Sequence, residues 1–87
     1  MSENVQPIGR VTHYFDRIRV AVIKLETELI LGDWIHFYHE GRTNFVQQVE
    51  SMEIDRQQIE EAYSGDEVAV QVVDRVKEGD IVYPYVD

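Results

Sequence analysis

Cysteine is absent from this sequence of 87 residues, and no hydrophobic run approaches the roughly 18 to 20 residues that cross a bilayer as a helix. The first absence excludes disulfides and thiolate metal sites and is compatible with a reducing compartment. The second excludes a transmembrane helix, and the N-terminus lacks the basic and apolar regions of a signal peptide. We therefore expect a cytoplasmic protein that makes no membrane contact.

Basic residues are also scarce. Eight Lys and Arg stand against seventeen Asp and Glu, for a net charge of −9. The imbalance is concentrated in residues 43–87, so any contact with nucleic-acid phosphates is expected to use the N-terminal half of the chain. Solubility is the simpler explanation for the acidic excess. No Gly-x-x-x-x-Gly-Lys-Ser/Thr motif occurs, which excludes a phosphate-binding loop and hence nucleotide binding of that kind.

The length and the hydrophobic content of 44% predict one globular domain over residues 8–87, preceded by a flexible lead-in over residues 1–7. Proline, which interrupts strands, occurs only at Pro7 and Pro84. Short segments with β-branched or alternating apolar residues predict six strands, over residues 8–15, 19–25, 34–38, 43–52, 67–73 and 81–85. Residues 55–62 are ambiguous between a turn and a single helical turn capped by Asp55.

The chain is organised around the stretch from Leu29 to Tyr38, in which a Gly-Asp turn precedes alternating residues. Glycine enters positive φ at little steric cost, and aspartate bonds nearby backbone, so Gly-Asp predicts a turn. The same pair recurs at residues 65–66 and 79–80, each time before an apolar strand. In the strand after the first turn, Ile35 and Phe37 are expected to face the core. The pattern predicts an all-β fold, a small closed antiparallel β-barrel of six strands.

The order of these motifs resembles the second domain of translational GTPases, the β-barrel of elongation factor Tu and its relatives. The segments that carry the resemblance are residues 24–27, 29–35, 49–52, 62–70 and 77–82. The turn at Thr27-Glu28 departs from the family by being one residue shorter and lacking its glycine. A free-standing barrel of this kind also resembles the C-terminal accessory domain of some collagenase-like peptidases.

The resemblance implies a non-catalytic binding module, associated with translation through an RNA or ribosome contact. The alternative is a protein-interaction or accessory domain, as in collagenase-like peptidases. Neither implies a cofactor, and a monomer is favoured, with self-association through strand edges as a minor alternative. An enzyme is not expected, since no Ser, His and Asp set has the spacing of a nucleophile elbow and nothing places two carboxylates in one pocket.

Aromatic side chains mark the first candidate site. Trp34, His36 and Tyr38 are expected to share the outer face of one strand, where aromatics stack bases or anchor a protein partner. If the second strand lies beside it, Val20 and Val22 extend that face. The alternative is that the N-terminal tail, a loop or the helical turn covers the face in the folded chain.

Basic side chains mark the second candidate site, for phosphates or an acidic partner: Arg17, Arg19, Lys24 and Arg42. Scattered surface charges are the simpler explanation. His36 and His39 are three residues apart, which on a strand points them to opposite faces, so no metal site is expected. The acidic run from Glu50 to Glu61 is expected to be a solvated face.

Overall fold

The computed structural model describes residues 5–86, in which the chain forms ten strands and no helix. Residues 5–7 lead into the first strand without strand structure; the rest of the expected lead-in lies outside the described residues. The strands are β1 (Gly9–Phe15), β2 (Val20–Leu25), β3 (Leu29–Ile30), β4 (Trp34–His39), β5 (Thr43–Gln48), β6 (Met52–Ile54), β7 (Gln57–Gln58), β8 (Glu61–Ala62), β9 (Glu67–Gln71) and β10 (Ile81–Pro84). The prediction of an all-β chain is confirmed.

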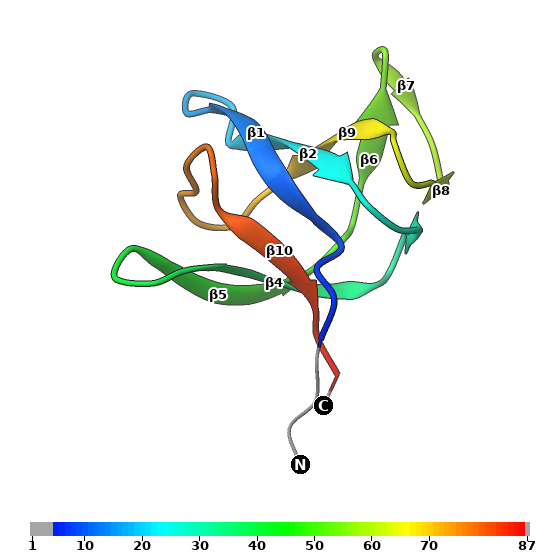
Figure 1. Ribbon diagram of the computed structural model, residues 1–87. Coiled ribbons are helices and arrows are strands. Elements are labelled where there is room, and N and C mark those ends of the chain that lie inside the picture. The colour runs from blue at the N-terminus through cyan, green and yellow to red at the C-terminus, as the bar shows by residue number, and fades with distance from the viewer. Residues whose placement is uncertain (1–4, 87) are drawn as a thin grey trace.

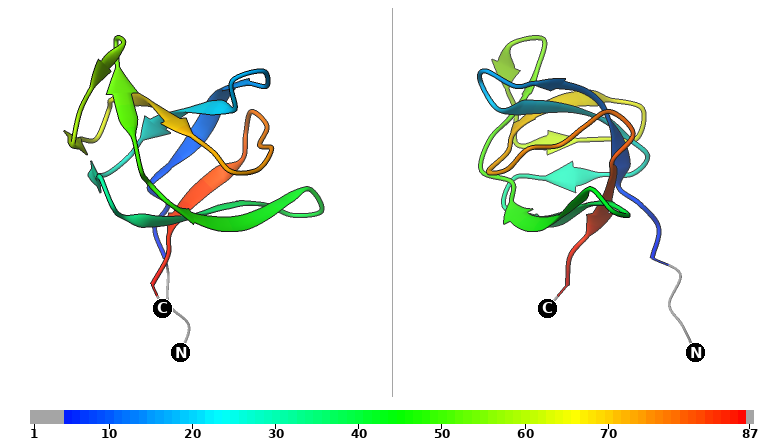
Figure 2. Two further views of the ribbon diagram at one scale, coloured as in Figure 1. Left: turned by 180° about the vertical axis from the view of Figure 1, so that it is seen from behind. Right: turned by 90° about the vertical axis from the view of Figure 1, so that its left-hand side faces the viewer.

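The strands form one eight-stranded antiparallel sheet in the order β5-β4-β10-β1-β2-β9-β6-β7, together with a separate β3-β8 pair. Figure 1 shows the sheet bending so that β4 and β5 lie on one side and β2, β9 and β6 on the other, with β1 and β10 between them. The turned views in Figure 2 show how strongly it curls. The expected count of six strands is wrong for this sheet, which has eight. The sheet has two edge strands, β5 and β7, and no backbone pairing between these two strands is seen in the described residues.

Two differences from the expected strands have local causes. The segment expected as one strand over 43–52 divides into β5 and β6, because Val49 leaves the β4-β5 ladder and exchanges backbone hydrogen bonds with Gly32 and Asp33. Of the two alternatives left open for residues 55–62, the single helical turn does not form. Asp55 and Arg56 instead form the tip of the β6-β7 hairpin, with φ of 51° and 66°.

The three Gly-Asp pairs form the same turn. Gly32, Gly65 and Gly79 have φ of 97°, 94° and 95°, a conformation in which a side chain is strained. Each aspartate donates its backbone N–H to the carbonyl three residues earlier and accepts that residue's N–H through Oδ2, at 2.8–3.0 Å. The repeated motif therefore fixes three corners of the sheet by one geometry.

The core lies on the concave side of the curled sheet. Ile35 and Phe37 are fully buried, as the alternation predicted, and Phe37 stacks on Phe45 of the neighbouring strand with centroids 5.0 Å apart. The inner face of β2 contributes Ala21, Ile23 and Leu25, also as expected. The outer faces of the strands are therefore the surfaces open to partners.

A side chain links the edge strand β5 to the end of the interior strand β9 in the other part of the curled sheet. Gln47 of β5 is buried; its Nε2 donates to the carbonyl of Gln71 at 2.9 Å, and its Oε1 accepts the N–H of Val73 at 2.8 Å. Because one amide satisfies a donor and an acceptor at the end of β9, Gln47 links β5 to β9 where no strand pairing joins them in the described residues.

Candidate functional site

The outer face of β4 carries the aromatic residues singled out in the sequence. Trp34 is 50% exposed, whereas His36 and Tyr38 are half-buried. The imidazole of His36 meets the ring of Tyr38 edge-on with centroids 5.8 Å apart, and its Nε2 donates to Oδ1 of Asn44 at 2.6 Å. These contacts hold the ring of His36 between its neighbours.

Strand β10 adds a residue that the sequence analysis missed. Tyr83 pairs with His36 across the β4-β10 ladder, and the two rings lie 6.4 Å apart. We call Trp34, His36, Tyr38 and Tyr83 the outer aromatic face. The alternation from Ile81 could have placed Tyr83 outward, but only the pairing of β10 with β4 brings it into this face.

Val20 and Val22 do not extend the outer aromatic face. In the sheet, β10 and β1 separate β4 from β2, so the expected neighbourhood of these strands is wrong. Arg10 and Lys24 pair across β1 and β2, and with Arg10 opposite Ile81 they occupy the outer surface between the two regions. The two valines instead belong to a different surface, described below.

The predicted basic set is dispersed. Arg17 and Arg19 lie exposed in the turn between β1 and β2, with Arg19 at a φ of 57°, whereas Lys24 lies at the other end of β2, opposite Glu67 of β9. Arg42 lies in the turn between β4 and β5. The structure therefore does not gather the four cations around one point.

The side chain of Arg42 is engaged within the chain. Its Nε donates to Oδ1 of Asp80 at 3.0 Å, Nη2 contacts the same oxygen, and Nη2 also donates to the carbonyl of Glu78 at 3.0 Å. Asp80 is fully buried, and its Oδ2 accepts the hydroxyl of Thr43 at 2.7 Å and the N–H of Lys77 at 2.9 Å. Arg42 thus serves first to neutralise a buried carboxylate.

These contacts set the ionisation of Asp80. Burial by itself would raise the pKa of the carboxyl, but the hydrogen bonds from Thr43, the Lys77 amide and Arg42, with the charge of Arg42, outweigh burial and lower the pKa. Asp80 is therefore an ionised structural group at neutral pH. It is not a candidate acid or base for chemistry.

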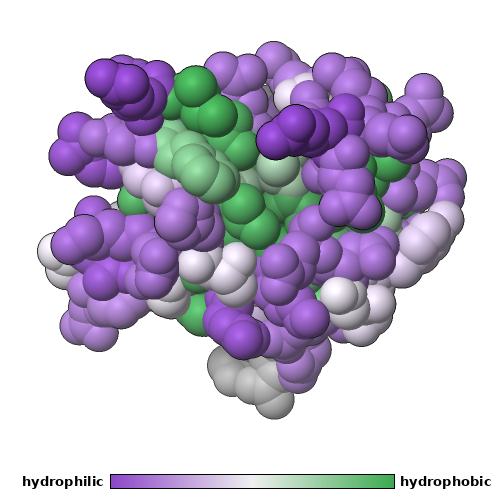
Figure 3. Space-filling view, turned by 90° about the horizontal axis from the view of Figure 1, so that it is seen from above, coloured by the Kyte–Doolittle hydropathy of each residue, from purple (hydrophilic) through white to green (hydrophobic). Residues whose placement is uncertain are grey.

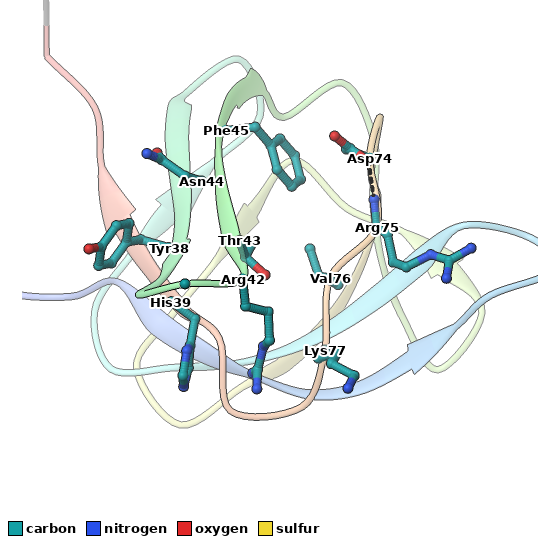
Figure 4. Close-up of a pocket in the computed structure, with 11 residues that line it drawn as sticks. Tyr38, His39, Arg42, Thr43, Asn44, Phe45, Asp74, Arg75, Val76 and Lys77 are labelled. Atoms are coloured by element: carbon teal, nitrogen blue, oxygen red, sulfur yellow. Dashed lines mark hydrogen bonds between the residues drawn. The ribbon is translucent and has the colours of Figure 1, made fainter.

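A cavity of about 620 Å³ lies beside this cluster, between the β4-β5 turn and residues 74–77. Figure 4 shows Phe45 and Val76 facing each other across it, with His39, Arg42 and Lys77 extending together away from that apolar part. Arg75 extends in a different direction in the same view. The cavity is thus lined mainly by polar side chains, with Phe45 and Val76 as its apolar part and basic side chains at its margin.

The histidines have ordinary partners. His13 lies 3.5 Å from Glu78, and Nδ1 of His39 lies 3.2 Å from the carbonyl of Glu40. Among residues 5–86, no three His, Asp or Glu side chains are grouped so that they could hold a metal ion. In the same part of the chain, no helix is long and apolar enough to cross a membrane.

Comparison with models of known protein families gives no match. The chain is 36% identical over 76 residues to a Methanocaldococcus jannaschii protein named as an uncharacterized protease, covering 87% of this chain and 19% of that protein. It is 29% identical over 79 residues to two Porphyromonas gingivalis proteins named collagenase, covering 90% of this chain and 22% or 19% of theirs. The chain thus spans about a fifth of the length of the curated relatives it matches.

Among solved structures, the fold is similar to the C-terminal domain of a Geobacillus thermoleovorans protein classed as a U32 peptidase. One crystal structure of that domain superposes with a TM-score of 0.84 at 18% identity and covers 90% of this chain and 98% of the domain; a second gives 0.85 at 17%, covering 91% of each. These comparisons support the expected likeness to the accessory barrel of collagenase-like peptidases. They give no support to an identity with the second domain of translational GTPases.

Proposed function

We propose that this chain is a non-catalytic accessory domain of the collagenase-like peptidase type that acts by binding protein. The observation that carries the proposal is the extent of the likeness. Nearly the whole chain matches about a fifth of proteins named protease or collagenase, and its fold matches a C-terminal domain that forms an ordered structure by itself. The ionisable groups of the structure agree with this, because Asp80, the buried carboxylate, is fully engaged in structural contacts.

The outer aromatic face is the proposed contact surface. Large, rigid aromatic side chains dominate protein interfaces because they bury much apolar area at a low cost in side-chain entropy. His36 is held by Tyr38, Tyr83 and Asn44, so the centre of the face is ordered before any partner binds. Trp34, half exposed at one end, is the side chain with most area left to bury.

Affinity capture tests this proposal. The chain is immobilised and used on an extract of the cells that encode it, and bound proteins are quantified by mass spectrometry. We expect proteins with a peptidase-type domain to be enriched, and Trp34→Ala to reduce that enrichment at least about ten-fold while added salt changes it little. Tyr63→Ala is the matched control, since Tyr63 is an aromatic residue of similar exposure outside the face.

Enrichment that Trp34→Ala and Tyr63→Ala reduce equally would overturn the assignment of the face. The proposed lack of catalysis is measured separately by incubating the purified chain with denatured collagen. We expect no new peptide termini above the level of a buffer control. Cleavage that persists through repeated purification would contradict the non-catalytic role.

Contact with RNA is the second candidate function. It is favoured by Arg17 and Arg19, which lie in one exposed turn and form no ion pair with any acidic residue among residues 5–86. Such a contact requires affinity for transfer RNA that falls steeply with salt and is lost in Arg17→Glu and Arg19→Glu. Absence of binding at low salt would remove this candidate and leave protein binding as the function.

We also propose that the curled sheet works as a closed barrel. Its support is the Gln47 link between β5 and β9, which joins the two parts of the sheet by side-chain hydrogen bonds. A sealed cylinder would hold the outer aromatic face at a fixed curvature.

A further inference from the structure

A second apolar surface also lies on the outer face of the sheet, but on strands at the opposite side of the molecule from the outer aromatic face. The outer faces of β1, β2 and β9 and the turn after β1 form a groove of about 600 Å³. Its apolar members are Phe15, Ile18, Val20, Val22 and Ala69, which we call the apolar groove. Figure 3, looking down on this side, shows a continuous hydrophobic area bordered by hydrophilic residues.

A β-bulge in β1 creates this surface. Val11 pairs with Ile23, but the next paired residue is His13, opposite Val22, so that Thr12 is an extra residue in the ladder. The extra residue reverses which side chains face outward. Phe15, which strict alternation would place on the same side as Val11, instead lies opposite Val20 on the outer face.

The groove leaves large hydrophobic side chains in solvent. Ile18 is 60% exposed and Phe15 46% exposed, and both stand at the tip of the β1-β2 hairpin. Ile18 lies in a turn, where polar residues are usual. The ring of His13 meets Phe15 edge-on with centroids 4.3 Å apart, and the parts of Phe15 and Ile18 that stay exposed are available to another molecule.

The border of the groove is acidic along β6, the β6-β7 turn and β9, whereas the exposed Arg17 and Arg19 flank Ile18 in the β1-β2 turn and are outside the lining. Glu53, Asp55 and Glu67 line the groove, with Arg56 as the single cation among the lining residues. Figure 1 shows that the β6-β7 hairpin, which carries Asp55 and Arg56 at its tip, rises on the side of the groove opposite the β1-β2 turn. An occupant must therefore combine apolar side chains for the floor with positive charge for the border.

The charge pattern also argues against other occupants. A second copy of the chain would bring the same acidic border and a formal charge of −9, so self-association through this groove is opposed by repulsion. Nucleic acid and anionic lipid surfaces would be repelled by the lining carboxylates Glu53, Asp55 and Glu67 in the same way, so the RNA contact considered for Arg17 and Arg19 does not extend into the groove. A basic protein segment is the occupant that satisfies both the apolar floor and the acidic border.

We propose that the apolar groove binds an extended segment of a partner protein in which leucine-like side chains are flanked by lysine or arginine. Leucine side chains that alternate along an extended segment would enter the floor together, since residues i and i+2 share a face. The flanking cations would reach Glu53 and Glu67 at the border. This groove is separate from the outer aromatic face, so the chain can hold two partners at once.

The test uses the blocked peptide Lys-Leu-Ala-Leu-Lys as the probe, with binding mapped by amide chemical shifts of the labelled chain. We expect the largest shifts at Val20, Val22 and Ala69, and an affinity that falls about ten-fold in Ile18→Ser. Val73→Ser is the matched control, because Val73 is 67% exposed in a loop outside the groove. Glu53→Lys should also weaken binding several-fold, and more strongly at low salt than at high salt.

Three results of the peptide experiment would overturn the proposal: no shift at millimolar peptide, shifts that gather on the outer aromatic face, or equal binding of the charge-reversed peptide Glu-Leu-Ala-Leu-Glu. A concentration-dependent dimer that Ile18→Ser abolishes would also overturn it, in favour of a second copy as occupant. Melting temperatures of each variant show whether lost binding reflects lost folding. None of these outcomes decides the proposed function, which is tested separately by affinity capture with Trp34→Ala.

Discussion

Three aspartates occupy the same position in the same turn, but their surroundings differ. Asp33 and Asp66 are half-buried and accept one backbone N–H each through the side chain. Asp80 is fully buried and also accepts from Thr43 and Arg42. The sequence motif accounts for the backbone contact in all three turns, whereas the burial and the additional partners of Asp80 come from β5 packing against the 72–80 loop.

Replacing Asp80 should therefore cost more than replacing its counterpart Asp33. In Asp80→Asn the amide can still accept one hydrogen bond, but the charge that balances Arg42 is lost, and we expect the free energy of unfolding to fall by about 2–3 kcal/mol. Asp33→Asn, with no cation partner, should cost less than about 1 kcal/mol. Urea denaturation of both variants measures the difference, and equal losses would show that Arg42 contributes nothing through Asp80.

Asp80 should also make stability depend on pH. Its pKa is lowered in the folded chain, so ionised Asp80 stabilises the fold fully above its unfolded pKa of about 3.9. This stabilisation declines as the pH falls from there towards the lower folded pKa. We expect the stability difference between the wild type and Asp80→Asn to be constant from pH 7 to 5 and to shrink below pH 4, as measured by urea denaturation across that range. A difference that grows on acidification would contradict the assigned direction.

At the scale of elements, the β6-β7 hairpin shows why the sequence of residues 55–62 was ambiguous between a turn and a helical turn, and why no helical turn forms. Asp55 followed by Gln58 suits a helix N-terminus by sequence alone. The two residues between paired Ile54 and Gln57 both have positive φ instead, as in the type I′ turns that match the twist of a two-residue hairpin. Pairing of β6 with β9 decided the outcome, because it commits residues 52–53 to the sheet.

Arg56 is strained in that turn, since residues other than glycine, asparagine and aspartate rarely adopt positive φ. We expect Arg56→Gly to raise the free energy of unfolding by about 0.5–1 kcal/mol, with a matching rise in melting temperature. Gln57→Gly, one residue further along in β7, is the control and should lower stability by a similar amount, because glycine weakens a strand. Destabilisation by Arg56→Gly would mean that its side chain contributes more than its backbone strain costs.

At the scale of the whole molecule, the curvature of the sheet depends on contacts between residues far apart in sequence. Gln47 and Gln71 are 24 residues apart, yet one side-chain amide satisfies backbone groups at the end of β9. This link keeps the two sides of the sheet together. It therefore also keeps the outer aromatic face and the apolar groove on opposite sides.

Removing the amide should loosen this link. We expect Gln47→Ala to lower the free energy of unfolding by about 1–3 kcal/mol, since it leaves the Gln71 carbonyl and the Val73 N–H without their partner. Hydrogen exchange at Val73 should accelerate together with this loss. Gln48→Ala, which removes an exposed side-chain bond to Gly32, is the control and should change stability by less than about 0.5 kcal/mol. Unchanged exchange at Val73 would contradict the role proposed for the Gln47 link in closing the sheet.

The sequence by itself determined the local features of this protein: six of its strands, the inward side chains of β2 and β4, and the three Gly-Asp corners. These depend on residue type and on the two-residue period of a strand, both of which can be read along the chain. The divided strand at Val49, the bulge at Thr12 and the hairpin at Asp55-Arg56 were missed because each depends on a pairing partner.

Only the tertiary structure decided which faces the outward residues share. Trp34 and Val22 follow the same pattern in sequence, but β10 and β1 lie between their strands and place them on different surfaces. From the sequence, Arg42 was a candidate for binding phosphates or an acidic partner, but in the fold it is paired with Asp80. The physical reason is that strand neighbours and buried ion pairs join residues tens of positions apart, where periodicity along the chain carries no information.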